Sequence, residues 1–115
     1  MNDHPPVRRR GAIVGLRADA MDEYCSLHAN IWPEVAAANR QAGITNHSIF
    51  LLRGKGLLFS YSEYRGEDQE ADARTLAANP VVQKWWEVCR PLQVPVIAPK
   101  GARRWTDMDL IFHQP

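Results

Sequence analysis

The 115-residue sequence predicts an α+β fold of the ferredoxin-like βαββαβ type. Three observations predict it. Short runs with strand patterning occur near both ends of the chain and twice in the middle, and stretches with helical patterning separate them. The length suits one domain with a single core. The order strand, helix, strand, strand, helix, strand is that of a split unit built on an antiparallel sheet.

The first half of the chain predicts one strand and a helix that breaks in two. Residues 11–16 are apolar on both faces, as in a buried strand. Asp19 is placed to cap the helix that follows, whose first turn is acidic. Pro33 must break or kink this helix and can open a second helical segment over 34–42. Gly43 suits the left-handed position after a helix end.

The second half predicts a hairpin, two further helical segments and a last strand. The hairpin turn is Gly-Lys-Gly, and Asn79-Pro80 has the cap and first-turn chemistry of a helix start. The predicted segments are strands 46–52 and 57–64, a polar helix over 67–78, a helix opened by Asn79-Pro80, an extended loop over 91–101 and a final strand over 107–112. In the first of these strands His47, Ile49 and Leu51 share one face.

Composition limits the partners and the compartment. Formal charge is +1, too weak a field to predict nucleic acid or an anionic membrane as a partner, and no apolar run approaches the roughly 20 residues that span a bilayer. Residues 1–10 hold prolines and arginines but no long apolar stretch, so we expect a flexible lead-in, not an export signal, followed by one domain over 11–115. Cys25 and Cys89 fit no disulfide framework or metal spacing and predict buried thiols in a reducing cytoplasm.

A tyrosine and a histidine on the helix before Pro33 are candidates for chemistry. Tyr24 and His28 are four residues apart, so they lie one turn apart on the same helix stripe. An imidazole, with an ordinary pKa of about 6.5, can give and take protons at neutral pH. Spacing by itself favours a structural histidine and a half-buried tyrosine, so the catalytic interpretation of His28 needs further support.

Other aromatic side chains are candidates for ligand contacts. His47 opens the second predicted strand, where exposure at an edge is the simplest interpretation. Trp85 and Trp86 are adjacent on a helix and point about 100° apart, so one can face a pocket while the other packs in the core or an interface. An indole face stacks on the C–H surface of a sugar as readily as on a base or a side chain.

Motifs for several other chemistries are absent from the sequence. It has no glycine-rich phosphate loop, no GxSxG elbow, no HExxH and no Cys-rich cluster, so we expect no metal and no nucleotide cofactor. The three arginines at 8–10 lack interleaved aromatics and predict solvated charge instead of a nucleic-acid surface. Helices cover one face of the predicted sheet and the other needs a cover or a ligand, so we expect a homodimer in which two sheets pair.

The segment EYCSLHANIWPE, residues 23–34, resembles the Y-x3-H-x2-[IV]-W-P-E sequence of the L-rhamnose mutarotase family. The hairpin NHSIFLLRGKGLLFSYSEY, the doublet QKWW and the ending DLIFHQP resemble further motifs of that family. The resemblance to this family thus extends from about Gly11 to His113. It implies a dimeric α/β-barrel enzyme that uses no cofactor and interconverts the α and β anomers of a 6-deoxyhexose. It places His28 on the proton donor and Tyr24, Trp85 and Trp86 on substrate-binding positions.

His47 departs from this resemblance, because the rhamnose enzymes commonly have a sugar-contacting tyrosine there. Residues 63–86 and the Gln-Val-Pro at 93–95 look more like relatives associated with L-fucose, so L-rhamnose and L-fucose are both open as substrates. His47 is our candidate for the second proton-transfer partner or for a specificity contact. The alternative functions are a non-catalytic small-ligand-binding domain and a cofactor-free monooxygenase, both of which lack the Y-x3-H-x2-I-W-P-E pattern.

Overall fold

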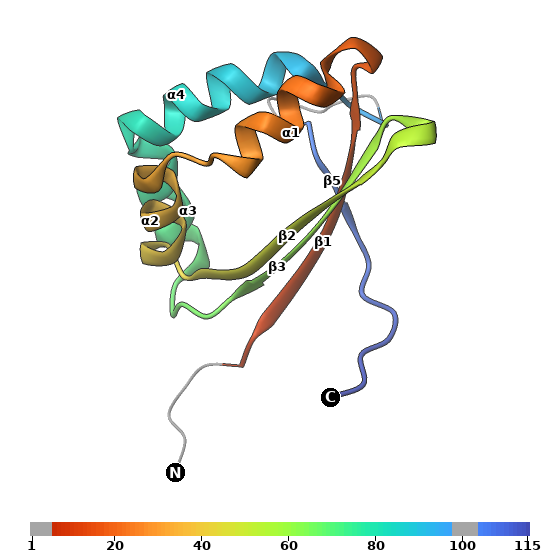
Figure 1. Ribbon diagram of the computed structural model, residues 1–115. Helices are drawn as coiled ribbons and strands as arrows, with labels where there is room; N and C mark the ends of the chain where they lie inside the picture. The colour runs from red at the N-terminus through yellow and green to blue at the C-terminus, as the bar shows by residue number, and fades with distance from the viewer. Residues whose placement is uncertain (1–5, 98–103) are drawn as a thin grey trace.

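The computed structural model describes residues 6–97 and 104–115. Within them, four α-helices lie together on one face of a five-stranded antiparallel sheet (Figure 1). The helices and strands are, in chain order, β1 (Arg8–Leu16), α1 (Met21–Ala29), α2 (Pro33–Gln41), β2 (Ile44–Leu52), β3 (Leu57–Tyr64), α3 (Gln69–Ala78), α4 (Pro80–Cys89), β4 (Gln93–Val94) and β5 (Thr106–Met108). None of the described helices is long and apolar enough to cross a membrane.

The strand order confirms the ferredoxin-like prediction. The sheet runs β2-β3-β1-β4, with neighbouring strands antiparallel. β5 also pairs with β1, antiparallel to it: Val94 of β4 lies opposite Gly15, and Met108 of β5 lies opposite Gly11. Both short strands therefore run in the same direction along the same edge of β1. Together they form the fourth strand of the fold in two pieces.

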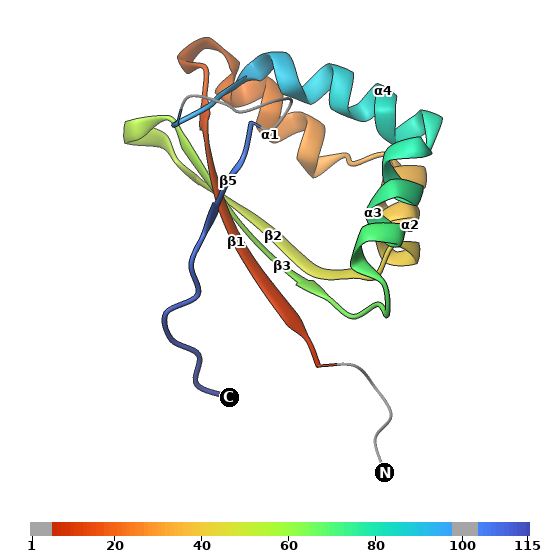
Figure 2. The same cartoon turned by 180° about the vertical axis from the view of Figure 1, so that it is seen from behind.

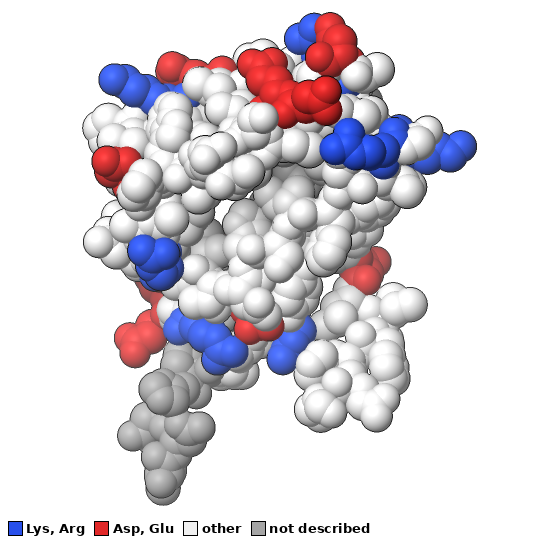
Figure 3. All heavy atoms as spheres, in the orientation of Figure 1, with Lys and Arg blue, Asp and Glu red and all other residues white. Residues whose placement is uncertain are grey.

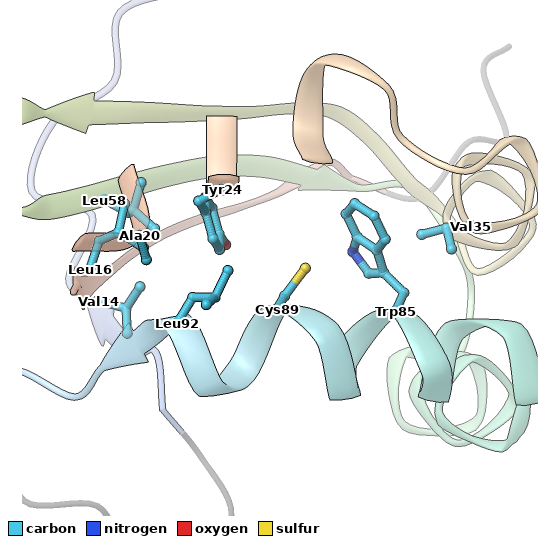
Figure 4. Packing of buried hydrophobic residues seen from close by; sticks show 9 residues of the cluster. All are labelled: Val14, Leu16, Ala20, Tyr24, Val35, Leu58, Trp85, Cys89 and Leu92. Carbon is cyan, nitrogen blue, oxygen red and sulfur yellow. The ribbon is translucent and has the colours of Figure 1, made fainter. Parts of the chain in front are cut away.

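Strand alternation separates a covered face of the sheet from an open one. Val14 of β1 lies opposite Leu58 of β3, and both side chains are fully buried beneath the helices. The core is formed by Val14, Leu16, Ala20, Tyr24, Val35, Leu58, Trp85, Cys89 and Leu92 (Figure 4). The opposite face has none of the four helices against it (Figure 2). On this open face Phe50 of β2 is 64% exposed.

The predicted helix starts and stops are mostly confirmed. Trp32 has an extended backbone (ψ 129°) and Pro33 is the first residue of α2, so the chain turns a corner there. Gly43 has a φ of +81° after the end of α2. Asn79 ends α3 and caps α4, because its side-chain oxygen accepts the backbone N–H of Val81 at 2.9 Å.

Three predicted features before the last strand are wrong. Asp19 does not cap α1; it lies in a 3-10 turn before the helix, where its carboxylate accepts a hydrogen bond from Arg17 at 2.8 Å. β1 begins at Arg8, because β3 extends to Tyr64 and supplies a partner, so residues 8–10 belong to the sheet and not to the lead-in. The predicted loop over 91–101 contains β4, since β1 offers an unpaired edge at that point. Residues 1–5 and 98–103 lie outside the described residues.

The predicted last strand is wrong beyond Met108. Residues 109–115 form no strand and run away from the sheet (Figure 1). If they continued the pairing of β5, they would lie along the arginines of β1 at 8–10. Instead Leu110, Ile111 and Phe112 project from the molecule, and Ile111 is 94% exposed. The alternation of apolar side chains that predicted a strand is therefore present, but this chain supplies no partner for it among the described residues.

Candidate functional site

A pocket of about 340 Å³ opens between the helices and the covered face of the sheet. Its volume lies in the range of small-molecule sites. The lining residues come from α1, the turn after it, α2, β2 and α4, and are His28, Ile31, Asn39, His47, Ile49 and Trp85. We call it the two-histidine pocket. On the face shown in Figure 3 the surface is hollowed between the helices and the sheet, and charged side chains lie around the periphery. An uncharged lining suits a neutral ligand.

His28 is held on α1 by a hydrogen bond within its own helix. Its Nδ1 lies 2.9 Å from the backbone oxygen of Tyr24. Because a carbonyl oxygen can only accept, Nδ1 carries the hydrogen, and Nε2 is the ring nitrogen that exchanges protons. Burial lowers the pKa of His28, and the bond to the Tyr24 carbonyl opposes this shift in part. The structure therefore supplies a partly buried imidazole with a fixed orientation.

Tyr24 lies behind His28 and does not line the pocket. Its ring stacks on the imidazole with 4.3 Å between centroids, so the predicted one-turn neighbours do touch. Its side chain is 3% exposed, and its hydroxyl accepts a hydrogen bond from Nε2 of Gln93 at 3.2 Å. Burial raises the pKa of Tyr24 to about 12. The ring of Tyr24 thus supports His28 from the core, and its role as a substrate contact stays a prediction.

Of the tryptophan doublet, Trp85 lines the pocket, and Trp86 packs against the periphery of the core. Trp85 is 6% exposed and makes T-shaped ring contacts with His28, at 5.1 Å between centroids, and with Trp32, at 5.2 Å. It projects from α4 toward the sheet (Figure 4). Trp86 is half-buried, does not line the pocket, and lies under the guanidinium of Arg90 at 4.7 Å. The two rings diverge as the helical angle between neighbouring residues predicts.

A β-bulge directs His47 into the pocket. Thr45 lies opposite Glu63 and Ser48 opposite Tyr61, so Asn46 and His47 together oppose a single residue of β3. With this register His47 shares the covered face with Ile49, as the alternation predicted. The side chain of His47 keeps part of its surface open to solvent, as expected at an edge strand, and its pKa is lowered by partial desolvation in the pocket and by the positive charges of its neighbours His28 and Arg10. The structure thus brings His47 and His28 into one site.

Sequence reasoning missed the carboxylate that holds the bulge. Glu63 is 9% exposed and accepts hydrogen bonds from Asn46 at 3.0 Å, Tyr61 at 2.7 Å and Arg65 at 3.0 Å. These donors, Asn46 first, lower the pKa of Glu63 to about 2. An acidic residue inside a strand otherwise made of aromatic, aliphatic and hydroxyl residues was the available signal. Asn39, the pocket amide, was also missed and has no signal beyond its place in an Ala-rich helix.

The cysteines are free thiols, and only one is buried. Cys89 is buried in the core, which raises its pKa to about 11. Cys25 is only partly buried, contrary to prediction, because it lies on the outer side of α1 near Arg53. Across the part of the chain that the structure describes, no group of three or more His, Cys, Asp or Glu side chains could hold a metal ion.

Comparisons with known proteins agree on one family. The family model described as L-rhamnose mutarotase matches residues 9–114. The L-rhamnose mutarotase of Lactiplantibacillus plantarum is 38% identical over 105 residues, which are 91% of this chain and 96% of the relative. That of Bacillus subtilis is 36% identical over 86 residues, 75% of this chain and 80% of the relative. A crystal structure of an L-rhamnose mutarotase from Formosa agariphila has a TM-score of 0.74 at 21% identity, covering 94% of this chain and 99% of that one, which supports the fold.

Proposed function

This chain belongs to the L-rhamnose mutarotase family, and from that premise we propose that it interconverts the α and β anomers of L-rhamnose. The observation that carries the proposal is the pocket itself, which is lined by His28, His47 and the indole of Trp85 and by no Asp, Glu, Lys or Arg side chain. The relatives described above all act on L-rhamnose by name, which favours this sugar over L-fucose.

The proposed reaction needs proton transfer at two oxygen atoms of the sugar. The pyranose opens when its ring oxygen gains a proton and the anomeric hydroxyl loses one. The C1–C2 bond then turns, and the ring recloses on the other face of the carbonyl. His28 presents Nε2 for this exchange, because its Nδ1 is committed to the backbone oxygen of Tyr24. Both protons pass between sugar and side chains, so the proposal involves no cofactor.

We assign sugar contacts to the other pocket residues by their chemistry. Trp85 offers an apolar ring edge beside His28 for the C–H surface or the 6-methyl group. Asn39 offers both a donor and an acceptor to sugar hydroxyls. His47 offers a ring nitrogen to a sugar hydroxyl in the same pocket. In this proposal Tyr24 acts by stacking on His28, and Trp86 supports the helix layer by packing against the core and under Arg90.

The choice of sugar is tested by anomer exchange in a panel that contains L-rhamnose and L-fucose. We expect catalysed exchange of L-rhamnose to exceed that of L-fucose at equal sugar and protein concentrations. Saturation-transfer NMR between the two anomeric proton signals measures both rates, with buffer as the blank. Faster exchange of L-fucose contradicts the assigned substrate but leaves the reaction type intact. Binding without exchange, or consumption of oxygen, contradicts the reaction type.

We further propose that the protein acts as a homodimer in the cytoplasm. Phe50 and Leu52 lie exposed on the open sheet face, and the tail after β5 exposes Leu110, Ile111 and Phe112. Apolar side chains gathered in this way are typical of a surface that another chain covers. Since a two-fold dimer places the same patch on both partners, one second copy can cover both regions. The free thiols fit a reducing compartment.

Placing a charge on the tail or the open face is expected to weaken the dimer. Ile111→Asp and Phe50→Asp should each raise the dimer dissociation constant by about tenfold or more, equivalent to about 1.4 kcal/mol, because a carboxylate must be desolvated in the interface. Light scattering after size exclusion measures the mass against that of the 13.0-kDa chain. The control is Lys84→Asp, an exposed position on the helix layer. A wild type that is monomeric at all concentrations contradicts the proposal.

A further inference from the structure

We propose that His28 and His47 act as an acid–base pair, in which His28 protonates the ring oxygen of the sugar while His47 removes the proton of the anomeric hydroxyl. The inference rests on the proposed mutarotase function and names the second proton-transfer group for it. Both imidazoles line the same pocket.

Both imidazoles line one pocket and can face the same reacting carbon of a bound sugar. His28 enters the pocket from α1 and His47 enters it from β2, so the two rings approach a ligand from the helix side and the sheet side. The ring oxygen and the anomeric oxygen are both bonded to C1 of the sugar. One pocket with two imidazoles can therefore serve both oxygens in a single bound orientation.

The surroundings of the two rings assign the acid and the base. His28 bonds a carbonyl oxygen through Nδ1, which favours its charged form. Partial desolvation in the pocket and the positive charges of His28 and of Arg10 in β1 disfavour the cationic form of His47, although its side chain keeps contact with solvent. When the pair holds one proton, that proton rests on His28, and His47 stays neutral. His28 is then the acid and His47 the base.

The remaining ionisable groups near the pair do not change this assignment. Arg10 is ion-paired with Asp107 of β5 at 2.7 Å, so part of its field is neutralised. Tyr24 of α1 and Cys89 of α4 have pKa values raised by burial to about 12 and about 11, and both are neutral at the pH of interest. The pocket side chains contributed by α2 and α4, Asn39 and Trp85, do not titrate.

Asn46 positions His47 for this role. It is the one non-glycine residue with a positive φ (+48°) among those the structure describes, and it occupies the bulge beside His47. Strained backbone of this kind persists only where the surroundings enforce it. Here the side chain of Asn46 donates to Glu63 at 3.0 Å. That bond fixes the bulge from the open face, while the next residue, His47, projects into the pocket on the covered face.

The proton balance closes over one cycle. On ring opening, protonated His28 gives its proton to the ring oxygen as the bond from that oxygen to C1 breaks, and His47 takes the proton of the anomeric hydroxyl as the carbonyl forms. After rotation about C1–C2, His47 returns its proton to the carbonyl oxygen. The hydroxyl of the former ring oxygen attacks C1 and gives its proton back to His28. The pair again holds one proton.

The pH dependence of catalysed exchange tests the pair. Since His28 must be protonated, kcat/KM falls as the pH rises through its pKa, and this limb lies below about pH 6.5 because that pKa is lowered. Since His47 must be neutral, kcat/KM falls again as the pH drops through the lower pKa of His47. In His47→Gln we expect an exchange rate about 10²-fold lower that declines only as the pH rises. The control is Lys55→Gln at an exposed turn, in which kcat/KM should still fall at both low and high pH.

Several outcomes would overturn the pairing. If the exchange rate of His47→Gln still falls at both low and high pH, His47 takes no part in proton transfer. If its residual rate falls only as the pH drops, the acid and base roles are reversed. A histidine NMR titration of the wild type is an independent measurement, in which His28 must protonate at higher pH than His47. Asn46→Gly keeps the left-handed backbone and removes the bond to Glu63. If kcat and the fall in exchange rate at low pH are both unchanged in this variant, Asn46 does not position His47. A wild type without catalysed exchange contradicts the proposed function itself.

Discussion

Replacing His28 by glutamine is expected to lower catalysed anomer exchange by about 10²- to 10⁴-fold, the usual contribution of a positioned proton-transfer group. Glutamine keeps the volume and polarity of the side chain but cannot exchange a proton at neutral pH. Since His28 is only partly buried and contributes one local hydrogen bond, the fold should survive the change. Saturation-transfer NMR with L-rhamnose measures the rate, and circular dichroism monitors the fold.

A change on the outer side of the same helix is the control for this variant. Ser26 is exposed on α1, two residues before His28. Ser26→Gln should exchange the anomers at the wild-type rate, since it leaves the pocket untouched. If His28→Gln exchanges the anomers as fast as Ser26→Gln does, then His28 is not the proton-transferring residue and the proposed mechanism fails.

Replacing Trp85 by alanine is expected to cost about 3–5 kcal/mol of unfolding free energy, the usual range for deleting a buried aromatic side chain. Trp85 contacts both His28 and Trp32 and is 6% exposed, so its removal leaves a cavity at the junction of α1, α2 and α4. Urea denaturation at matched protein concentrations measures the change, because the apparent stability of the proposed dimer would depend on concentration.

Trp86→Ala is the control that shows whether the loss of unfolding free energy comes from core packing or from removing any tryptophan. Trp86 is half-buried, packs against the periphery of the core and contacts Arg90, so its removal should cost less than that of the more deeply buried Trp85. A loss for Trp86→Ala equal to that for Trp85→Ala would contradict this difference in burial between the two residues. Trp85→Phe, which keeps a ring, should recover part of the stability.

The order of strands and helices along the chain could be predicted from the sequence, because the signals for each element are local. Alternation defines β3 to the residue, and Pro33, Gly43 and Asn79 mark helix ends by backbone chemistry that acts within one turn. The edge of β1 could not be predicted in the same way. Whether a segment pairs there depends on contacts between distant residues. The local pattern therefore predicts a loop where β4 lies and a strand in the tail after Met108.

The candidate site could be predicted only where neighbours in sequence are neighbours in space. The stacking of Tyr24 on His28 follows from helical spacing. The meeting of His28 with His47 needs the packing of α1 over β2, which no local pattern specifies. The bond from Asn46 to Glu63 could not be predicted for the same reason, because it joins two strands across a bulge. The hydroxyl of Tyr24 lies against Gln93, a partner 69 positions away.

The most direct test of the account is the rate of anomer exchange in L-rhamnose with the purified wild-type protein. Saturation of one anomeric proton signal should transfer to the other at a rate proportional to protein concentration, above the rate in buffer. Exchange that equals the buffer rate at every protein concentration, with the protein folded and in its native oligomeric state, would contradict the claim that the two-histidine pocket catalyses mutarotation.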